Sequence, residues 1–212
     1  MNKLNYSIKI LDNFLNKEDF DYLCTLHQDT DLENEFKVYH NEINDDMIIN
    51  SSIDQNFLRK IHKNYFLKAM NILKEICPEK TGLYDYSDFT IIKTKKNSKF
   101  PIHDDTPNKL LSGVIYLHPK KNSGTIFYSD KKGSNKTIID WKPNRAVFFS
   151  RKEKETWHSY EGDGNNDRIA LVYNLMTNKL KEVYKIEKKN YLLGNFRFKI
   201  NPYLFKYFKT NI

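Results

Sequence analysis

The segment Phe100-Pro101-Ile102-His103-Asp104-Asp105 opens the stretch that decides the fold, and Trp157-His158 followed by Arg168 closes it. On a β-strand, residues i and i+2 project from the same face, about 6 to 7 Å apart. His103 and Asp105 can therefore direct an imidazole and a carboxylate at a common point. His158 is the candidate third ligand. Two histidines and one carboxylate form the facial triad that binds non-haem Fe(II) and leaves coordination positions open.

An isolated His-x-Asp is weak evidence, because a chain with six histidines contains one by chance with a probability on the order of one in three. Its surroundings strengthen it. A polar loop, 95–99, precedes the pair, which predicts a strand start near a barrel mouth, where functional sites often lie. An apolar strand, 145–149, precedes His158. The turn 162–166 predicts a hairpin that holds His158 and Arg168 on neighbouring strands.

Arg168 is the candidate anion ligand. A guanidinium inside a barrel needs an anionic partner, because a buried unpaired charge is costly, and the carboxylate of a small ligand can bind it through two hydrogen bonds. Tyr116, in Val114-Ile115-Tyr116-Leu117, can point inward beside it. The alternatives are an Arg168 on the surface, paired with Asp163 or Asp167, and a His158 that packs on Trp157.

The N-terminal part of the chain predicts two helices. Residues 6–11 alternate as a strand does, and Asn16 or Asp12 can cap a helix over 17–28. A short strand is expected over 36–39. Apolar residues then recur every three or four positions from Ser52 or Asp54 to Cys77, where Pro78 ends the helix.

After this helix the apolar period shortens to that of strands. The predicted fold class is α+β, mainly β, an antiparallel barrel or sandwich with N-terminal helices packed on one sheet. The expected strands are 89–94, 111–117, 125–129, 137–141, 145–150, 156–158 and 168–175.

The net charge of +8 comes mostly from the C-terminal segment, since residues 178–212 contain nine basic and two acidic side chains. Basic residues interleaved with aromatic ones are typical of nucleic-acid binders. Aromatic side chains that pack back on the sheet, with lysines in water, explain the pattern more simply. No apolar run is long enough for a membrane span, so we expect a soluble, cytoplasmic protein with no membrane contact. Cys24 and Cys77 are expected to be reduced thiols on apolar helix faces.

Residues 100–175 resemble the double-stranded β-helix (jelly-roll, cupin-like) core of 2-oxoglutarate and Fe(II)-dependent oxygenases, in the prolyl 4-hydroxylase-like branch. The resemblance depends on the order and spacing of several motifs, and the opening segment 8–15 is similar as well. The motifs are His103-Asp104-Asp105, Tyr116-Leu117, Gly124, Pro143-Asn144-Arg145 before Val147-Phe148-Phe149, His158 and Arg168.

The resemblance implies a role for each matched residue. His103, Asp105 and His158 would hold Fe(II), Arg168 would bind the distal carboxylate of 2-oxoglutarate, and Tyr116 would hydrogen-bond to that carboxylate. It implies O2 as a second cosubstrate, succinate and CO2 as products, hydroxylation of a C–H bond, and ascorbate as an optional reductant. Lys93 stands where some prolyl hydroxylases have tyrosine, and Ala170 where relatives often have serine.

A single domain over 1–212 is expected. It comprises supporting elements over 1–88, the catalytic core over 89–176 and a basic, aromatic extension over 177–212. The predicted enzyme is a dioxygenase whose substrate is a peptidyl proline. The alternatives are hydroxylation of an amino acid or sugar, oxidative demethylation of nucleic acid, and a non-catalytic binding protein. Asp104 is expected to face solvent, and His27, His40, His62 and His118 to have structural or surface roles. Oligomeric state is left open.

Overall fold

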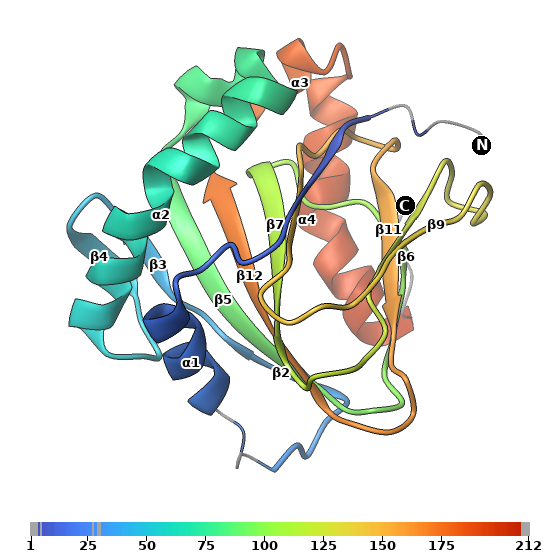
Figure 1. Cartoon of the computed structure of the whole chain (residues 1–212). Coiled ribbons are helices and arrows are strands. Elements are labelled where there is room, and N and C mark those ends of the chain that lie inside the picture. Colours follow the sequence, from blue (N-terminus) through green and yellow to red (C-terminus); the bar gives the residue numbers. More distant parts are fainter. Residues whose placement is uncertain (1–3, 5, 27, 29–30, 209–212) are drawn as a thin grey trace.

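Two antiparallel sheets face each other and form the core of the molecule (Figure 1). The computed structural model describes residues 4, 6–26, 28 and 31–208. The larger sheet has the order β1 (Ile8–Leu11), β10 (Ala146–Phe149), β7 (Lys109–His118), β12 (Arg168–Met176), β5 (Tyr86–Thr94), β3 (Glu42–Asn44), β4 (Met47–Asn50), and β2 (Phe36–Tyr39) also pairs with β5. The smaller sheet has the order β6 (Lys99–His103), β11 (Trp157–Glu161), β8 (Thr125–Tyr128), β9 (Thr137–Ile139).

The helices cover the outer face of the larger sheet. The first is α1 (Lys17–Thr25), which begins at Asn16, whose side chain accepts a hydrogen bond from the Asp19 amide at 2.8 Å. The second is α2 (Gln55–Ile76), which Asp54 caps in the same way on Phe57. Both caps satisfy an amide that the first helical turn leaves unpaired. After α2, Pro78 opens a short 3-10 helix, η1 (Pro78–Leu83). The predicted double-stranded β-helix, with its N-terminal helices on one sheet, is confirmed.

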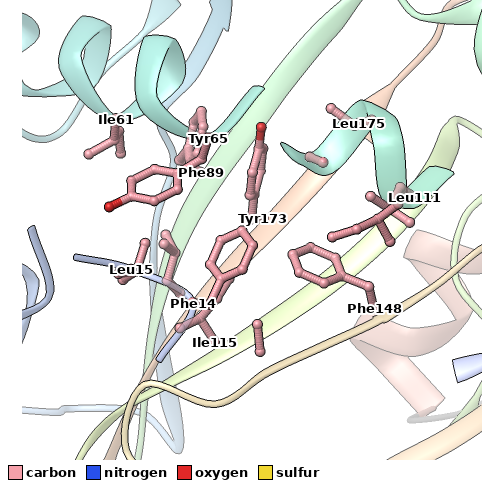
Figure 2. Packing of buried hydrophobic residues seen from close by; sticks show 14 of the residues in the cluster. Phe14, Leu15, Ile61, Tyr65, Phe89, Leu111, Ile115, Phe148, Tyr173 and Leu175 are labelled. Carbon is pink, nitrogen blue, oxygen red and sulfur yellow. The ribbon is translucent and has the colours of Figure 1, made fainter. Parts of the chain in front are cut away.

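Strand β12 shows how one sheet serves two purposes. Alternate side chains of a strand face opposite sides of its sheet. Ile169, Leu171, Tyr173 and Leu175 belong to the hydrophobic core beneath the helices. In Figure 2, Tyr173 and Leu175 lie among Tyr65, Phe89 and Phe148. The even-numbered residues Arg168, Ala170, Val172 and Asn174 line a cavity between the two sheets. Because the odd-numbered side chains of β12 pack in the hydrophobic core, the even-numbered ones must face the cavity.

Several elements differ from the prediction. Strands β3, β4 and β6 were not predicted, because they are only three to five residues long and Pro101 interrupts the last of them. The C-terminal segment forms helices α3 (Leu180–Ile186) and α4 (Tyr191–Phe208). The prediction that its aromatic residues pack on a sheet is wrong for Phe196 and Tyr203, which are 55% and 67% exposed. No helix within the described residues is long and apolar enough to cross a membrane.

Candidate metal and anion site

His103, Asp105 and His158 meet at one point of the cavity. One ligand atom from each residue lies within 4.8 Å of the others. His103 ends β6, and His158 lies opposite it on β11, so their ring centroids are 4.2 Å apart. Asp105 lies just beyond the end of β6, not at a strand start as predicted. Its Oδ2 is 4.0 Å from Nε2 of His158. The backbone has thus brought together side chains that are distant in sequence.

Main-chain carbonyls orient both imidazoles. Nδ1 of His103 is 2.9 Å from the carbonyl oxygen of Pro101, and Nδ1 of His158 is 3.0 Å from that of Thr156. A carbonyl only accepts, so each Nδ1 carries the proton and each Nε2 keeps a free lone pair. Metal-binding histidines are usually held in this way by a partner on the other ring nitrogen.

Electrostatics favour the protonation states that a metal ligand needs. Burial, aided by the neighbouring His158, lowers the pKa of His103 to about 3. Burial alone would raise the pKa of Asp105, but Lys109 and the two histidines outweigh it, and the net shift is downward. Nζ of Lys109 donates to Oδ1 of Asp105 at 2.7 Å. The site therefore presents a neutral imidazole and an ionised carboxylate with one oxygen already held.

Arg168 lies inside the same cavity, not on the surface. It is 6% exposed, and its Nε has no hydrogen-bond partner. Among the described residues no carboxylate forms a salt bridge with it, so the alternative pairing with Asp163 or Asp167 is absent from the described part of the chain. Burial lowers its pKa, and the nearby phenols of Tyr160 and Tyr116 offset this only in part. This guanidinium needs an anion that the described part of the chain does not supply.

Tyr116 and Tyr160 both flank Arg168, but only Tyr160 lines the inner cavity. The hydroxyl of Tyr116 donates to Oγ1 of Thr125 and accepts from the Thr125 amide, both at 2.9 Å. Its ring stacks on Trp141 at 4.5 Å. Tyr160 lines the cavity, and the guanidinium carbon of Arg168 lies 3.7 Å from its ring centroid. Sequence reasoning missed Tyr160, although its place two residues after His158 on the same strand pointed to it.

The connection between His158 and Arg168 is not the predicted hairpin. Strand β11 pairs with β6 and β8, whereas β12 pairs with β5 and β7, so the two residues belong to opposite sheets. The turn crosses between the sheets and is held by the loop before β6, where the amides of Gly162 and Gly164 donate to Ser98 and Lys96. This crossing lets the arginine face the histidine across the cavity.

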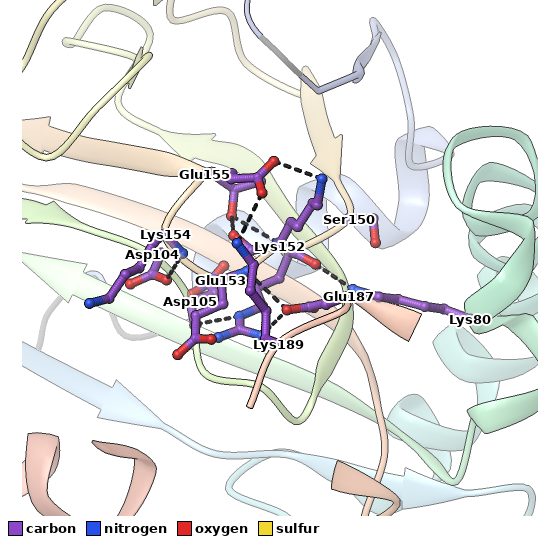
Figure 3. Close-up of polar contacts among 12 residues, drawn as sticks. Lys80, Asp104, Asp105, Ser150, Lys152, Glu153, Lys154, Glu155, Glu187 and Lys189 are labelled. Carbon is purple, nitrogen blue, oxygen red and sulfur yellow. Dashed lines mark hydrogen bonds and ion pairs between the residues drawn. The ribbon is translucent and has the colours of Figure 1, made fainter. Parts of the chain in front are cut away.

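A buried ionic network supports the Asp105 loop from behind (Figure 3). Glu187, at the end of α3, accepts from Nζ of Lys80 at 2.8 Å and from Nη1 of Arg151 at 2.7 Å. Nε of Arg151 donates to the main-chain oxygen of Asp105 at 3.0 Å. Asp104 is half-buried, not solvent-facing as expected, and accepts from the Lys154 amide at 2.8 Å. The C-terminal extension therefore helps to position Asp105, a candidate metal ligand.

Two cavities meet at the triad. The inner one, of about 400 Å³, lies between the sheets and contains Arg168. The outer one, of about 450 Å³, is bounded by His103 and Asp105 of the triad, by Trp157, and by Arg197 and Phe198 of α4. The role of the C-terminal segment stayed open in the sequence analysis, since its pattern does not show where α4 docks.

The other histidines and the cysteines lie elsewhere. His62 packs in α2 against Phe66, as expected, and His40 contacts Thr90. His118 ends β7, and His27 is outside the described residues. Cys24 and Cys77 are free, as predicted.

Comparisons with known proteins find similarity in structure but not in sequence. No protein-family model matches the chain, and a search of curated proteins gives no significant match. Many solved structures are similar to the chain, and three that are similar over most of it are as follows. A Pseudomonas putida prolyl-4-hydroxylase has a TM-score of 0.56 and 12% identity, over 82% of this chain and 94% of that one. A Burkholderia pseudomallei oxidoreductase of the 2OG-Fe(II) oxygenase family has a TM-score of 0.56 and 12% identity, over 80% and 84%.

The third is the dioxygenase for auxin oxidation 1 from Arabidopsis thaliana, in complex with 2-oxoglutarate, with a TM-score of 0.53 and 13% identity over 81% and 84% of the two chains. The expected resemblance to this group of oxygenases is therefore confirmed as a shared fold.

Proposed function

We propose that this protein is a 2-oxoglutarate- and Fe(II)-dependent dioxygenase that hydroxylates a C–H bond. One observation carries the proposal: a single buried cavity contains both the His103, Asp105 and His158 cluster and a guanidinium that lacks an anionic partner among the described residues. Either feature alone occurs in proteins of many kinds. Together they match a metal and a diacid that bind side by side.

The donor set fits Fe(II). Two neutral imidazoles and one carboxylate are the ligands of non-haem Fe(II) sites that keep positions open for other ligands. The carbonyls of Pro101 and Thr156 hold Nε2 of both histidines free, and Lys109 holds the second oxygen of Asp105. These contacts fix the ligands before any metal arrives.

The inner cavity fits 2-oxoglutarate. Arg168 would bind the distal carboxylate, which would supply the missing partner of its buried guanidinium. Tyr160 holds the guanidinium plane by stacking. Valine, isoleucine and phenylalanine side chains line much of the wall and would exclude water from the cosubstrate.

When bound, Fe(II) with 2-oxoglutarate and O2 supplies the oxidation, in which one oxygen atom enters the substrate as a hydroxyl and the other enters succinate as CO2 leaves. The protein's share is to hold three ligands, grip the diacid and admit a C–H bond of the substrate beside the triad. Ascorbate would serve as an auxiliary reductant. The proposed substrates, a peptidyl proline, a small metabolite or a nucleic-acid base, share this half of the reaction.

A direct test uses purified protein with Fe(II) and 2-oxoglutarate under anaerobic conditions. We expect the weak visible charge-transfer absorption of the chelate, and succinate once air is admitted. If neither appears, the protein is a binding module that has kept the fold without turnover.

A further inference from the structure

Besides the triad and Arg168, the inner cavity contains a pair of polar residues, Ser112 and Asn174. Asn174 lies at the opposite end of β12 from Arg168. Arg168 and Asn174 are on the same face of the strand, six residues apart, or about 20 Å at 3.3 Å per residue. Between them the inner face is apolar, with Ala170 and Val172 on β12 and Val114 on β7. The cavity therefore has two polar ends separated by an apolar middle.

Two buried oxygen atoms at this second end have no hydrogen-bond partner. Ser112 and Asn174 are opposite each other on β7 and β12, and they are 3% and 1% exposed. Neither Oγ of Ser112 nor Oδ1 of Asn174 has a partner among the described residues. Both side chains line the cavity that contains the triad. Buried polar atoms are nearly always paired, so these two indicate a ligand group.

The pair is unsuited to the carboxylates of 2-oxoglutarate. Nδ2 of Asn174 already donates to Oδ2 of Asp88 at 2.9 Å, so the amide presents its oxygen, an acceptor, to the cavity. Behind it, the side chain of Asp88 accepts from the neutral side chains of Thr90 and Asn174, so its oxygens add further acceptors and no cation at this end. Lys109, the nearby cation, is engaged by Asp105. This end therefore favours a hydrogen-bond donor over an anion.

We propose that Ser112 and Asn174 bind a hydroxyl or amino group of a small polar substrate. The inference rests on the proposed function, because it takes the triad as the place where that substrate reacts. A hydroxyl or an amine can donate to Oδ1 of Asn174 and also bond with Oγ of Ser112. The side chain of a peptidyl proline carries no donor and would leave both oxygens unpaired. The substrate class is thus a metabolite such as a sugar or an amino acid.

The test uses Zn(II) as a redox-inert metal together with 2-oxoglutarate, and binding of three probes followed by ligand-observed NMR. D-glucose supplies hydroxyls, L-leucine supplies an amine, and N-acetyl-L-proline methyl ester supplies the prolyl ring without any N–H or O–H donor. The main variant is Ser112→Ala, which removes a hydroxyl without an internal partner and so should fold normally. Ser87→Ala is the matched control, since this buried serine on β5 is paired with Tyr84, outside the residues that line the cavity.

We expect glucose or leucine to bind, and binding of that probe to weaken about tenfold in Ser112→Ala, as for loss of one hydrogen bond, with 2-oxoglutarate affinity unchanged. Whichever probe binds distinguishes a hydroxyl from an amine. The proposal is overturned if neither binds, if the prolyl ester binds as tightly, or if Ser112→Ala weakens 2-oxoglutarate binding instead. Wild-type protein that fails to bind 2-oxoglutarate at all would refute the proposed function itself, and this proposal with it.

Discussion

His103 and His158 are cross-strand partners on β6 and β11, and their imidazole rings lie 4.2 Å apart between centroids. Directly opposed residues on an antiparallel pair project from the same face of the sheet. The hydrogen bonds of the smaller sheet therefore set the separation of two proposed metal ligands. Asp105 is placed differently, by the loop that follows β6 and by its contacts with Lys109 and Arg151.

Replacement of His158 by alanine should abolish Fe(II)-dependent succinate formation and leave the fold intact. Two ligands hold a divalent ion far less tightly than three, and the ring contributes little to the core because it faces the cavity. The measurement is anaerobic Fe(II) binding together with succinate formation in air, with circular dichroism as the check on folding. His118→Ala, at the end of β7, is the control and should behave as wild type. Wild-type turnover in His158→Ala would show that His158 is not a metal ligand.

Arg168→Ala should weaken 2-oxoglutarate binding at least tenfold, in line with loss of hydrogen bonds to a charged group. Iron binding should be little changed, because Arg168 is at a distance from the triad on the opposite sheet. Titration of the charge-transfer absorption with 2-oxoglutarate measures the affinity. The control is Arg145→Ala, which removes a guanidinium paired with Asp12 near the surface. An unchanged affinity in Arg168→Ala would show that the diacid binds elsewhere.

Glu187→Ala should destabilise the protein by about 3 to 5 kcal/mol, because it leaves the buried cations of Lys80 and Arg151 without their carboxylate. It should also weaken metal binding, since Arg151 holds the main chain of Asp105. Urea unfolding measures the first effect and Fe(II) titration the second. Glu155→Ala, which breaks partly exposed ion pairs, should cost no more than about 1 kcal/mol. Equal losses in the two variants would contradict the role of the buried network.

The elements with a strong period could be predicted from the sequence. Helix α2 and strands β7 and β12 have continuous apolar patterns. The capping residue and the proline stop of α2 are also local sequence signals. The three members of the candidate metal cluster could be picked out as well, because each residue stands next to a recognisable strand or turn. Its meeting at one point depends on how strands pair, which a local pattern does not encode.

The rest depends on tertiary contacts. The crossing between β11 and β12 looks like a hairpin locally, since a glycine-rich turn of this length suits either connection. Asn174 became recognisable only once the inner face of β12 was known, whereas the two-residue spacing of Tyr160 from His158 was a signal that the sequence contained. Helix α4 has weak apolar periodicity, and contacts such as the Arg197 to Glu153 ion pair, at 3.1 Å, hold it beside the outer cavity. The sequence pattern of residues 191–208 does not predict the contact with Glu153.

His62→Leu should make the stability of the protein less dependent on pH between about 7 and 5. Burial lowers the pKa of His62 in the folded state, whereas in the unfolded chain it is near 6.5. As pH falls below that value the unfolded state takes up a proton that the folded state refuses, so stability is lost. The midpoint of thermal unfolding at each pH is the measurement. Phe66→Leu is the control, because it loosens the same packing without a titrating group and should shift the midpoint equally at every pH. A slope in His62→Leu equal to that of wild type would contradict this account.

Tyr160 should matter more than Tyr116 for 2-oxoglutarate binding, although the sequence pointed to Tyr116. The hydroxyl of Tyr116 is engaged twice by Thr125, so Tyr116→Phe removes no group that faces the cavity. Tyr160→Leu removes the ring against which the Arg168 guanidinium stacks, an interaction worth about 1 to 2 kcal/mol at a buried site. We therefore expect 2-oxoglutarate affinity to fall several-fold to about thirtyfold in Tyr160→Leu, and to change little in Tyr116→Phe or in Tyr160→Phe, which keeps the ring. Titration of the charge-transfer absorption distinguishes the three variants. A larger loss of 2-oxoglutarate affinity in Tyr116→Phe than in Tyr160→Leu would contradict this account. It would show that the Tyr116 hydroxyl binds the carboxylate and leaves Thr125 when the diacid binds.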